Sequence, residues 1–235
     1  MELGAEEASR VATLVKYNIM DSDSEEPFDR LAEIAAELFN VPIAYVSLVD
    51  GYRQWFKSKV GLSAQEMPRD WAFCARTIAR KEVVVIADAH KDPEFSASPA
   101  DARVRFFAGA PLLTAEGQAL GAVCVLDRRA RKPLSGHERQ LLQHLADMVM
   151  EQIELRRGLK RARASITKVA RLTGGGKPPA DEILSECDKA LAALQAVHDL
   201  TTRSARKRVR LMTPKHAAKR STGRERRQVA RGRAS

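Results

Sequence analysis

The 235-residue chain has few cysteines, few aromatic residues and no long apolar run. Three cysteines are too few, and odd in number, for a disulfide framework, and no histidine stands at ligand spacing beside them to form a zinc site. No segment approaches the about 18 consecutive apolar residues that a membrane-spanning helix needs, so no membrane span is expected. The acidic start, MELGAEEASR, lacks a hydrophobic run and therefore does not resemble a secretory signal, which predicts a cytoplasmic location.

Positive charge is abundant, and it is concentrated near the C-terminus. The net charge is +10, yet residues 201–235 contain 13 Lys or Arg and one acidic residue, Glu225, for a net +12, which leaves −2 for residues 1–200. Such a tail favours an anionic partner. Because the tail has no aromatic residue, it would bind nucleic acid through the phosphates alone, weakly and without sequence specificity. An acidic protein, an anionic membrane surface, or no partner at all are the alternatives.

Hydrophobic periodicity predicts short helices and a series of strands. Apolar residues at helical spacing predict helices over 6–18, 27–39 and 71–81. Apolar and β-branched runs predict strands over 41–50, 52–60, 83–89, 104–114 and 118–127, with 61–70 as a loop. Asp50-Gly51 predicts a hairpin turn between the first two strands. In the fourth strand, Gly109 predicts a close backbone approach and Pro111 an interruption of pairing. Helices flanking an antiparallel run of strands indicate the α+β class.

A long helix is predicted from residue 135. Ser135 and Glu138 form a capping box. Apolar residues then recur with a heptad pattern through residues 135–173, and this pattern predicts a homodimer through a coiled coil. The alternative is that the first part, Leu141 to Val149, only packs on the domain core. The members of the two heptad positions are Leu141, Met148, Leu155, Ala162 and Val169, and Leu145, Gln152, Leu159, Ile166 and Thr173.

These elements divide the chain into five segments. Residues 1–157 form the main domain, with the long helix starting at 135, and residues 158–173 continue that helix. Glycines and prolines make residues 174–180 a hinge. Residues 181–200 have the pattern of a further amphipathic helix, and 201–235 read as a disordered basic tail.

Five segments in order resemble the bacterial GAF domain, of the kind found beside histidine kinases and diguanylate cyclases. The segments are FDRLAEIAAELFNVPIAYVSLVDGYRQWFKSKVGL, PRDWAFCARTI, VVVIADAHKDPEF, VRFFAGAPLLTAEGQALGAVCVLD and LSGHERQLLQHLADMVM. The resemblance covers residues 10–157. It implies a GAF-like α+β fold, in which a central antiparallel sheet of five or six strands has helices on both sides and a long C-terminal helix. It also implies a sensory role, a small-molecule pocket on one face of the sheet, and dimerisation through the terminal helices.

The residues expected to line that pocket come from the third helix and the strands facing it. A mostly apolar wall with a few polar groups suits a small ligand. Arg105 could donate two hydrogen bonds to a carboxylate or phosphate, and Asp88 could accept a hydrogen bond. Each residue also has an ordinary explanation, as core, as a loop cap or as a solvated strand residue. The candidate ligand-binding residues are Trp55, Phe73, Cys74, Asp88, Arg105 and Phe107.

Known uses of the GAF fold do not fit the sequence well. Cys74 is followed by Ala75, and no Asp-Ile-Pro stretch exists, so a covalent bilin is not expected. The Asn-Lys, Phe and Asp signature of cyclic-nucleotide-binding members is missing. His90 is the one candidate haem ligand in the domain loops, and it reads as a surface residue. The cofactor therefore stays unknown, and no metal site is predicted.

One enzymatic use stays open as the remote alternative. A stand-alone GAF family reduces free methionine sulfoxide with a nucleophilic and a resolving cysteine. Cys124 lies in a strand that reads as buried and inert, and Cys74 lies near the expected pocket. Nothing in the spacing of the two cysteines places them together.

The sequence thus predicts a non-catalytic signal-sensing GAF domain protein that binds a small ligand, transmits a signal through a helical dimer interface, or does both. A signalling protein is the expected downstream partner. The alternative is an interaction adaptor in which the GAF fold is a scaffold and the tail, 201–235, binds nucleic acid or another anion. No catalytic residue is predicted, and Cys74 would be the nucleophile of the remote reductase alternative.

Overall fold

The computed structural model describes residues 4–71, 73–93, 95, 104–174 and 179–212. Its centre is a six-stranded antiparallel sheet in the order β3-β2-β1-β6-β5-β4. The strands are β1 Ile43–Val49, β2 Arg53–Val60, β3 Glu66–Pro68, β4 Val84–Ile86, β5 Phe106–Leu113 and β6 Ala119–Asp127. The helices are α1 Ala5–Tyr17, α2 Glu26–Leu38, the 3₁₀ turn η1 Arg69–Trp71, α3 Cys74–Arg80, α4 Gly136–Gly174 and α5 Ala180–Met212. The predicted α+β class is confirmed.

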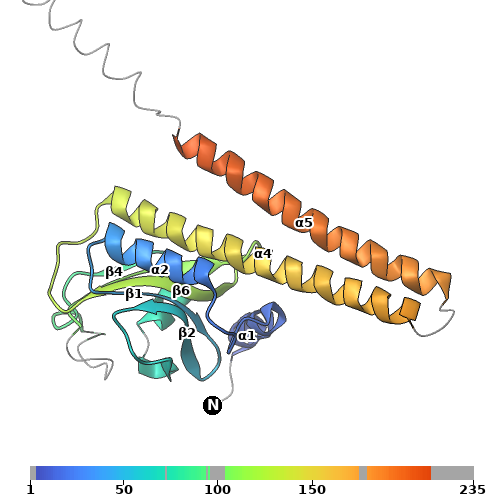
Figure 1. The fold of residues 1–235 in the computed structure, drawn as a ribbon. Helices are drawn as coiled ribbons and strands as arrows, with labels where there is room; N and C mark the ends of the chain where they lie inside the picture. The colour runs from blue at the N-terminus through green and yellow to red at the C-terminus, as the bar shows by residue number, and fades with distance from the viewer. Residues whose placement is uncertain (1–3, 72, 94, 96–103, 175–178, 213–235) are drawn as a thin grey trace, which may run out of the picture. The chain divides into compact units, whose positions relative to one another are not determined.

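The sheet separates two apolar cores. On one face, buried residues of α1, α2 and the first part of α4 pack against the central strands. On the other face, a second cluster includes residues of α3 and of the loops after it. Figure 1 shows α2 and α4 lying along the same side of the sheet. The alternation of side chains along each strand explains the division, because neighbouring residues of a strand point to opposite faces. We call these the α4 face and the α3 face.

A β-bulge interrupts this alternation in the hairpin of β1 and β2. The register shifts between Val46 and Ser47, so that Val46 pairs with Ser58 and Ser47 with Phe56. Lys57 therefore has no directly opposite residue in β1, and both Lys57 and Ser58 turn toward α2 on the α4 face. Phe56, one residue earlier, lies on the α3 face. Bulges of this kind re-aim one side chain without breaking the sheet.

The fourth predicted strand behaves as its glycine and proline indicate. A Cβ built on Gly109 would lie 2.7 Å from Thr77 Oγ1 of α3 and 3.2 Å from Cys124 Sγ, so the close approach is confirmed. Pro111 lies beyond β4, which pairs only with residues 107–109, and the register of β5 and β6 shifts just after Leu112. The predicted loop 61–70 was wrong in part, because residues 66–68 pair with β2 as β3.

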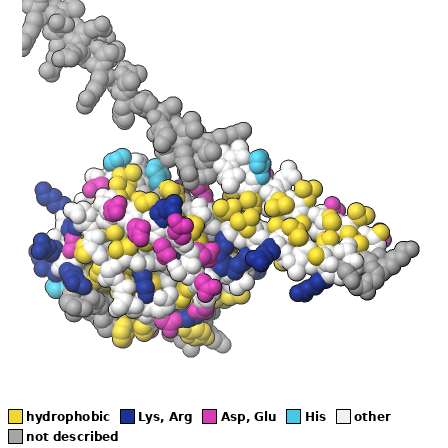
Figure 2. Space-filling model, viewed as in Figure 1, with side chains coloured by type: hydrophobic (Ala, Val, Ile, Leu, Met, Phe, Trp, Pro, Cys, Tyr) yellow, Lys and Arg dark blue, Asp and Glu magenta, His cyan; other side chains and the backbone are white. Residues whose placement is uncertain are grey.

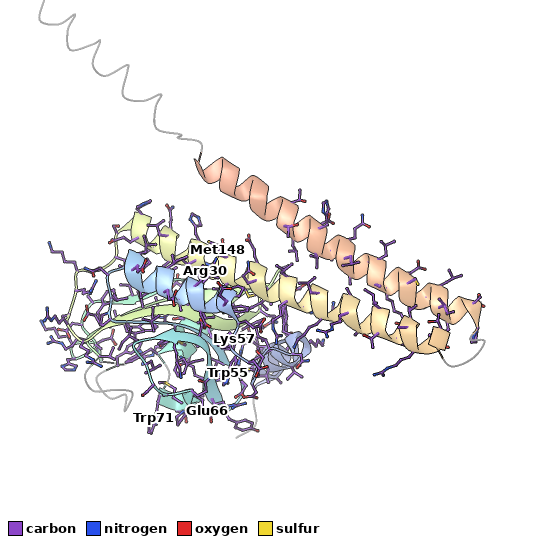
Figure 3. All side chains as sticks on the ribbon, in the orientation of Figure 1. Arg30, Trp55, Lys57, Glu66, Trp71 and Met148 are labelled. Atoms are coloured by element: carbon purple, nitrogen blue, oxygen red, sulfur yellow. The ribbon has the colours of Figure 1, made fainter. Side chains whose placement is uncertain are left out.

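The long helix begins with the predicted capping box. Ser135 N donates to Glu138 Oε2 at 2.7 Å, and Glu138 N donates to Ser135 Oγ at 3.3 Å. The first turns pack on the α4 face, and Figure 3 marks Met148 among them. The early heptad residues therefore contribute to the domain core. The buried residues of these turns are Leu142, Leu145, Ala146, Val149, Met150 and Ile153, with Leu141 and Met148 partly buried beside them.

Residues 1–161 and 162–235 form two compact units. In the second unit the end of α4 contacts α5, because Lys168 Nζ lies 3.0 Å from Glu186 Oε1 and Ala162 and Ala190 are buried. α5 continues past Leu200 to Met212, so the prediction of a disordered tail from residue 201 was wrong for residues 201–212. Residues 213–235 of the predicted tail and 175–178 of the predicted hinge lie outside the described residues.

Apolar side chains remain on the surface of the long helices. Leu159 and Ile166 of α4 are 49% and 53% exposed, and Leu184, Leu191 and Leu194 of α5 are also exposed. Figure 2 shows hydrophobic side chains gathered along these helices. In the part of the chain that the structure describes, no helix has the length and apolar character needed to cross a membrane.

Candidate functional site

Three of the six predicted pocket residues lie together on the α3 face. Phe73, Cys74 and Phe107 are all buried in the cluster that contains α3. Trp55 is not with them: it is buried on the α4 face, among residues of α1, α2 and α4. Figure 3 marks Trp55 beside Lys57 on β2. Trp55 therefore does not line the same space as Cys74, and its neighbour Phe56 lies on the α3 face instead.

The aromatic side chains of the α3 face stack on one another. The rings of Phe73 and Phe95 lie 4.7 Å apart and nearly parallel, and the rings of Phe73 and Phe107 lie 5.3 Å apart. The Arg76 guanidinium covers the outer ring, 3.9 Å from the centroid of Phe95. Stacked aromatic rings and a guanidinium over them contribute attraction beyond that of area burial.

Asp88 and Arg105 bind each other. Arg105 Nε and Nη2 donate to the two carboxylate oxygens of Asp88 at 2.8 and 2.6 Å. The Arg105 guanidinium lowers the pKa of Asp88, and Asp88 raises that of Arg105. The pair joins the loop after β4 to the start of β5, where Ala89 N also donates to Arg105 O. A ligand anion would therefore have to compete with Asp88 for the Arg105 guanidinium.

The polar centre of the α3 face is a pair of thiols. Cys74 begins α3 and Cys124 lies in the middle of β6, and their sulfur atoms are 3.0 Å apart. Two hydroxyl groups of β1 surround the same sulfur: Ser47 Oγ donates to Cys74 Sγ at 3.4 Å, and Tyr45 Oη lies 3.6 Å from it. Tyr45 and Ser47 share a face because they are two residues apart in β1.

The surroundings act differently on the two thiols. Burial would raise the pKa of Cys74, but hydrogen bonds from Cys124, Ser47 and Tyr45 outweigh burial and hold it below the ordinary value. Burial, and then the neighbouring Cys74 sulfur, raise the pKa of Cys124 well above the ordinary value. Burial likewise raises the pKa of Tyr45. Cys74 is thus the thiol whose anion is favoured, because donors point at its sulfur.

Two buried polar side chains beside the thiols lack hydrogen-bond partners. Gln54 of β2 is fully buried, and neither its amide nitrogen nor its oxygen makes a hydrogen bond within the described structure. Its amide still lies close enough to favour the anions of Tyr45 and Cys74. Thr77 Oγ1 of α3, beside Gly109, is also buried and makes no hydrogen bond to any described residue. Unsatisfied buried polar atoms are destabilising and rare in proteins, so they mark this place as unusual.

The α4 face has a polar group of the opposite character. Lys57 Nζ is fully buried and donates to Ser22 Oγ, Asp23 O and Glu25 Oε1, which uses all its protons. Arg156 of α4 donates to the same Glu25 oxygen at 2.6 Å and to Asn18 O at 2.9 Å. We call Lys57, Glu25 and Arg156 the α4 clamp, since they tie β2, the loop before α2, and α4 together.

The charges of the α4 clamp compensate one another. Partial burial would raise the pKa of Glu25, but hydrogen bonds from Lys57 and Arg156 outweigh burial and lower it. Burial lowers the pKa of Lys57, even though Glu25 opposes that shift. A lowered pKa of Glu25 favours the ion pair, whereas a lowered pKa of Lys57 disfavours it. Three oxygen acceptors surround the one ammonium, and this geometry favours the charged form of Lys57. Nearby, Tyr17 Oη donates to Glu154 of α4.

Sequence patterns gave no sign of the α4 clamp, and only the reductase alternative considered the two cysteines together. The cysteines of the thiol pair are 50 residues apart on different elements, and only the sheet brings them together. Lys57 looks like a solvated strand residue, because the oxygen atoms that surround its ammonium come from residues 22–25, more than 30 residues earlier in the sequence. Among the described residues, no group of three or more His, Cys, Asp or Glu side chains is placed to hold a metal ion.

Comparison with known proteins gives a family match and one curated relative. The profile of the GAF domain matches residues 23–153, more than half of the chain. A cyclic di-GMP phosphodiesterase of Pseudomonas aeruginosa is 40% identical over 151 residues, which are 63% of this chain and 26% of that protein. The chain therefore spans about a quarter of the length of this relative.

Several solved structures are also similar. The GAF domain of an Acinetobacter phosphoenolpyruvate-protein phosphotransferase has a TM-score of 0.48 and 18% identity, covering 64% of this chain and 94% of that one. Residues 122 to 287 of a methyl-accepting chemotaxis protein have a TM-score of 0.48 and 22% identity, covering 63% of this chain and 99% of that one. A free methionine-R-sulfoxide reductase from Neisseria meningitidis has a TM-score of 0.47 and 17% identity, covering 66% of this chain and 93% of that one.

Proposed function

Because the chain belongs to the GAF domain family, a family of sensory and regulatory domains, we propose that it is a non-catalytic sensor whose input is on the α3 face and whose output is α4. The input is a small ligand or a chemical change at Phe73, Cys74 and Phe107, with Asp88 and Arg105 at the rim. The output is a change in the geometry or stability of a homodimer formed through residues 135–173.

The observation that carries this proposal is the α4 clamp. α4 is a 39-residue helix whose first turns are part of the domain core. Arg156 holds it at the point where the buried residues of that core end, through Glu25 and Asn18. A helix that is packed on the sheet at one end and continues beyond the core is suited to carry a displacement from the domain to a partner.

A continuous set of contacts leads from the α3 face to this clamp. Tyr45, beside Cys74, packs edge-on against Phe56 with ring centroids 4.9 Å apart. Phe56 precedes the bulge residue Lys57, whose ammonium binds Glu25, and Glu25 binds Arg156 of α4. A shift of β2 at the bulge would thus move both the input and the output. Contiguity supports coupling without measuring it, and the dimer constant measured with and without a change at the α3 face would test it.

Apolar residues of α4 beyond the clamp support the dimer. Leu159 and Ile166 occupy one heptad position and are about half exposed in the single chain. In a coiled coil such residues would insert between residues of the partner helix. Leu141, Leu145 and Met148 pack on the domain core, so the proposed seam is strongest from Leu155 onward.

The similarity to part of a cyclic di-GMP phosphodiesterase supports a role in second-messenger signalling. The matched stretch is only 26% of that protein, which favours a regulatory part for this chain over hydrolysis of the messenger. We therefore propose a signalling enzyme or receptor as the downstream partner.

A second candidate is a scaffold with a basic tail. It is favoured by the close stacking of Phe73, Phe95 and Phe107, which fills part of the face where a ligand would sit. In that case the chain would act through the 13 basic residues of 201–235, by non-specific binding of nucleic acid or another polyanion.

A third candidate, a free methionine sulfoxide reductase, is favoured by the contact of Cys74 and Cys124. Loss of sulfoxide reduction in Cys74→Ser would support it.

The experiment that tests the input is mass spectrometry of small molecules released by denaturing the purified full-length protein, after an absorption spectrum. A stoichiometric compound supports the ligand sensor. A colourless protein without any compound favours the scaffold, and nucleic-acid binding across a salt series then tests the tail, with affinity falling steeply as salt rises.

The output is tested by sedimentation of heptad variants. Leu159→Glu and Ile166→Glu should each weaken the dimer about ten- to a hundredfold, because each removes about 1.5–3 kcal/mol of apolar burial. Ala164→Glu is the matched control: it adds the same charge at an exposed residue two positions before Ile166, outside both heptad positions, and should leave the dimer constant unchanged. Equal sedimentation of all three variants and the parent would contradict a dimer through this helix.

A further inference from the structure

We infer that Cys74 and Cys124 form a reversible redox site, in which a peroxide converts the two thiols to an internal disulfide and a dithiol reductant restores them. The two sulfur atoms are 3.0 Å apart, and both side chains are fully buried. A disulfide bond is about 2.05 Å long, so a movement of about 1 Å joins them. The redox site does not depend on the proposed function. Only the transmission of its change to α4 rests on that proposal.

The contacts assign a different part to each thiol. Cys74 Sγ has Ser47 Oγ and Tyr45 Oη around it in addition to the Cys124 thiol, and these groups can donate to a thiolate. Cys124, in the middle of β6, touches Cys74 and has no comparable set of donors among the described residues. Cys74 is therefore the thiol that attacks, and Cys124 is the thiol that resolves the product.

The reaction balances with hydrogen peroxide, or an alkyl peroxide, as the oxidant. The Cys74 thiolate attacks one peroxide oxygen, the O–O bond breaks, and the departing hydroxide takes a proton to leave as water, which leaves Cys74 as the sulfenic acid. The Cys124 sulfur then gives up its proton and attacks Cys74 Sγ, the S–O bond breaks, and a second water leaves. Two thiols and one hydrogen peroxide become one disulfide and two waters, and the sulfurs supply both electrons.

Unpartnered polar atoms surround the place where this oxygen chemistry would occur. Gln54 offers an amide donor and acceptor, and Thr77 a hydroxyl, and neither has a hydrogen bond in the described structure. A sulfenic acid and a departing hydroxide need such groups, whereas a pair of resting thiols does not. Gly109 keeps the space beside Thr77 and Cys124 free, because a Cβ there would lie within 3.2 Å of Cys124 Sγ and 2.7 Å of Thr77 Oγ1.

Oxidation would change the position of α3. Cys74 is the first residue of α3, so a disulfide would tie the start of this helix to β6. Ser47 would lose its hydrogen bond to the Cys74 thiol, and Tyr45, which packs on Phe56, would be released from Cys74. Through Phe56 and the bulge at Lys57, this change reaches the α4 clamp. This last step rests on the proposed function.

The direct experiment uses full-length protein carrying Cys187→Ser, because Cys187 is exposed and would react on its own. The reduced protein is exposed to hydrogen peroxide, denatured in an alkylating agent and analysed as peptides by mass spectrometry. We expect a peptide pair linked through Cys74 and Cys124, two mass units lighter than the reduced pair, that disappears after dithiothreitol. Folded protein should react slowly with Ellman's reagent, since both sulfurs are buried. Full alkylation of both cysteines after peroxide would overturn the inference.

Single variants in the same background separate the two roles. With Cys124→Ala, Cys74 should trap as a sulfenic acid adduct of dimedone, whereas with Cys74→Ala, Cys124 should give at least about tenfold less adduct. Ser47→Ala should slow labelling of Cys74 without removing it. Equal labelling of Cys74 and Cys124 would overturn the assignment of roles. Circular dichroism checks that each variant is folded, and the peptide analysis of the unaltered pair does not depend on any core substitution.

The site and the sensor can fail separately. The oxidised protein should melt roughly 10 °C higher, because the bond closes a loop of 50 residues. If the disulfide forms and the dimer constant also changes, both proposals are supported. A disulfide without any change in sedimentation keeps the redox site and removes α3 as the input to α4. Absence of the disulfide, with a ligand-dependent dimer, removes the redox site alone.

Discussion

The two faces of the sheet solve the problem of buried polar groups in different ways. On the α4 face, Lys57 is fully buried, yet each of its protons has an oxygen partner and its charge is offset by Glu25. On the α3 face, Gln54 and Thr77 are equally buried and have no hydrogen-bond partner within the described structure, beside two thiols in contact. A satisfied polar group is what a structural connection requires, whereas an unsatisfied group is retained when it serves another purpose. The comparison supports the proposal that the α4 face is the link and the α3 face is the site.

The largest expected effect comes from breaking the α4 clamp. Glu25→Ala leaves the buried Lys57 ammonium without its counter-charge and removes a partner of Arg156. Because Glu25 is about one-third exposed, we expect a loss of about 3 kcal/mol in the free energy of unfolding, at the lower end for a broken buried pair. Urea denaturation measures it. The matched control is Arg30→Ala, which breaks the exposed pair with Glu26 and should cost less than about 0.5 kcal/mol. Similar losses in both would show that the clamp is not special.

The next effect tests how tightly α3 sits on the sheet. Gly109→Ala places a Cβ 2.7 Å from both Thr77 Oγ1 and Phe107 Cζ, so that α3 or the ring must move. Overpacking of this kind typically costs about 1–3 kcal/mol, and it should also slow disulfide formation by separating Cys74 from Cys124. Gly136→Ala is the control, because a Cβ there meets nothing within 4 Å. A stable Gly109→Ala protein with an unchanged oxidation rate would contradict the close packing.

A pair of matched deletions sharpens the comparison between the faces. Ser58→Ala on the α4 face removes a hydroxyl that donates to Phe28 O at 2.9 Å, and should destabilise the protein by about 1 kcal/mol. Thr77→Val on the α3 face removes a hydroxyl that has no partner among the described residues, and should be neutral or stabilise by up to about 1 kcal/mol. Thermal and urea unfolding of both variants provide the check. If both variants lose the same stability, the two faces do not differ in the way described.

The smallest expected effect is the change in unfolding free energy at low pH. Lys57 and Arg156 lower the pKa of Glu25 in the folded protein below its ordinary value of 4.5. The carboxylate therefore contributes stability that is present above pH 4.5 and is lost as the pH falls through the folded pKa. Glu25→Gln lacks this contribution, so the difference in unfolding free energy between it and the parent should shrink below pH 4.5. A difference that stays constant from about pH 7 to about pH 3 would assign the clamp to packing alone.

Much of the fold could be predicted from local patterns, because the patterns report burial directly. The capping box at Ser135 and Glu138, the Asp50-Gly51 turn and the close approach at Gly109 were all confirmed. The short edge strand β3 was missed, since three residues give no periodicity. Residues 201–212 were predicted as tail because their basic composition resembles disorder, yet α5 continues through them.

The candidate site was harder to predict, because it depends on which face each strand residue takes. Alternation indicates that Trp55 and Phe56 point to opposite faces, but it does not indicate which face carries α3. Trp55 was expected beside Cys74, and the structure places it on the α4 face. Lys57 lies on the same face as Trp55, and oxygen atoms of residues 22–25 surround its ammonium, although sequence patterns assign this charge to solvent. Asp88 and Arg105 were each expected to bind a ligand, and their pairing with each other depends on two loops meeting in space.

Both borders of the sheet end in a strand of three residues, β3 on one side and β4 on the other. A foreign strand that tried to extend the sheet would find only a short row of free backbone groups there, and on the β3 side also a proline, Pro68, and a charged residue, Glu66, which Figure 3 marks. Such borders resist ribbon-like aggregation. The sheet thus offers a poor surface for association between copies, which agrees with the proposed contact through helices, where a contact can form and separate without adding to a growing fibril.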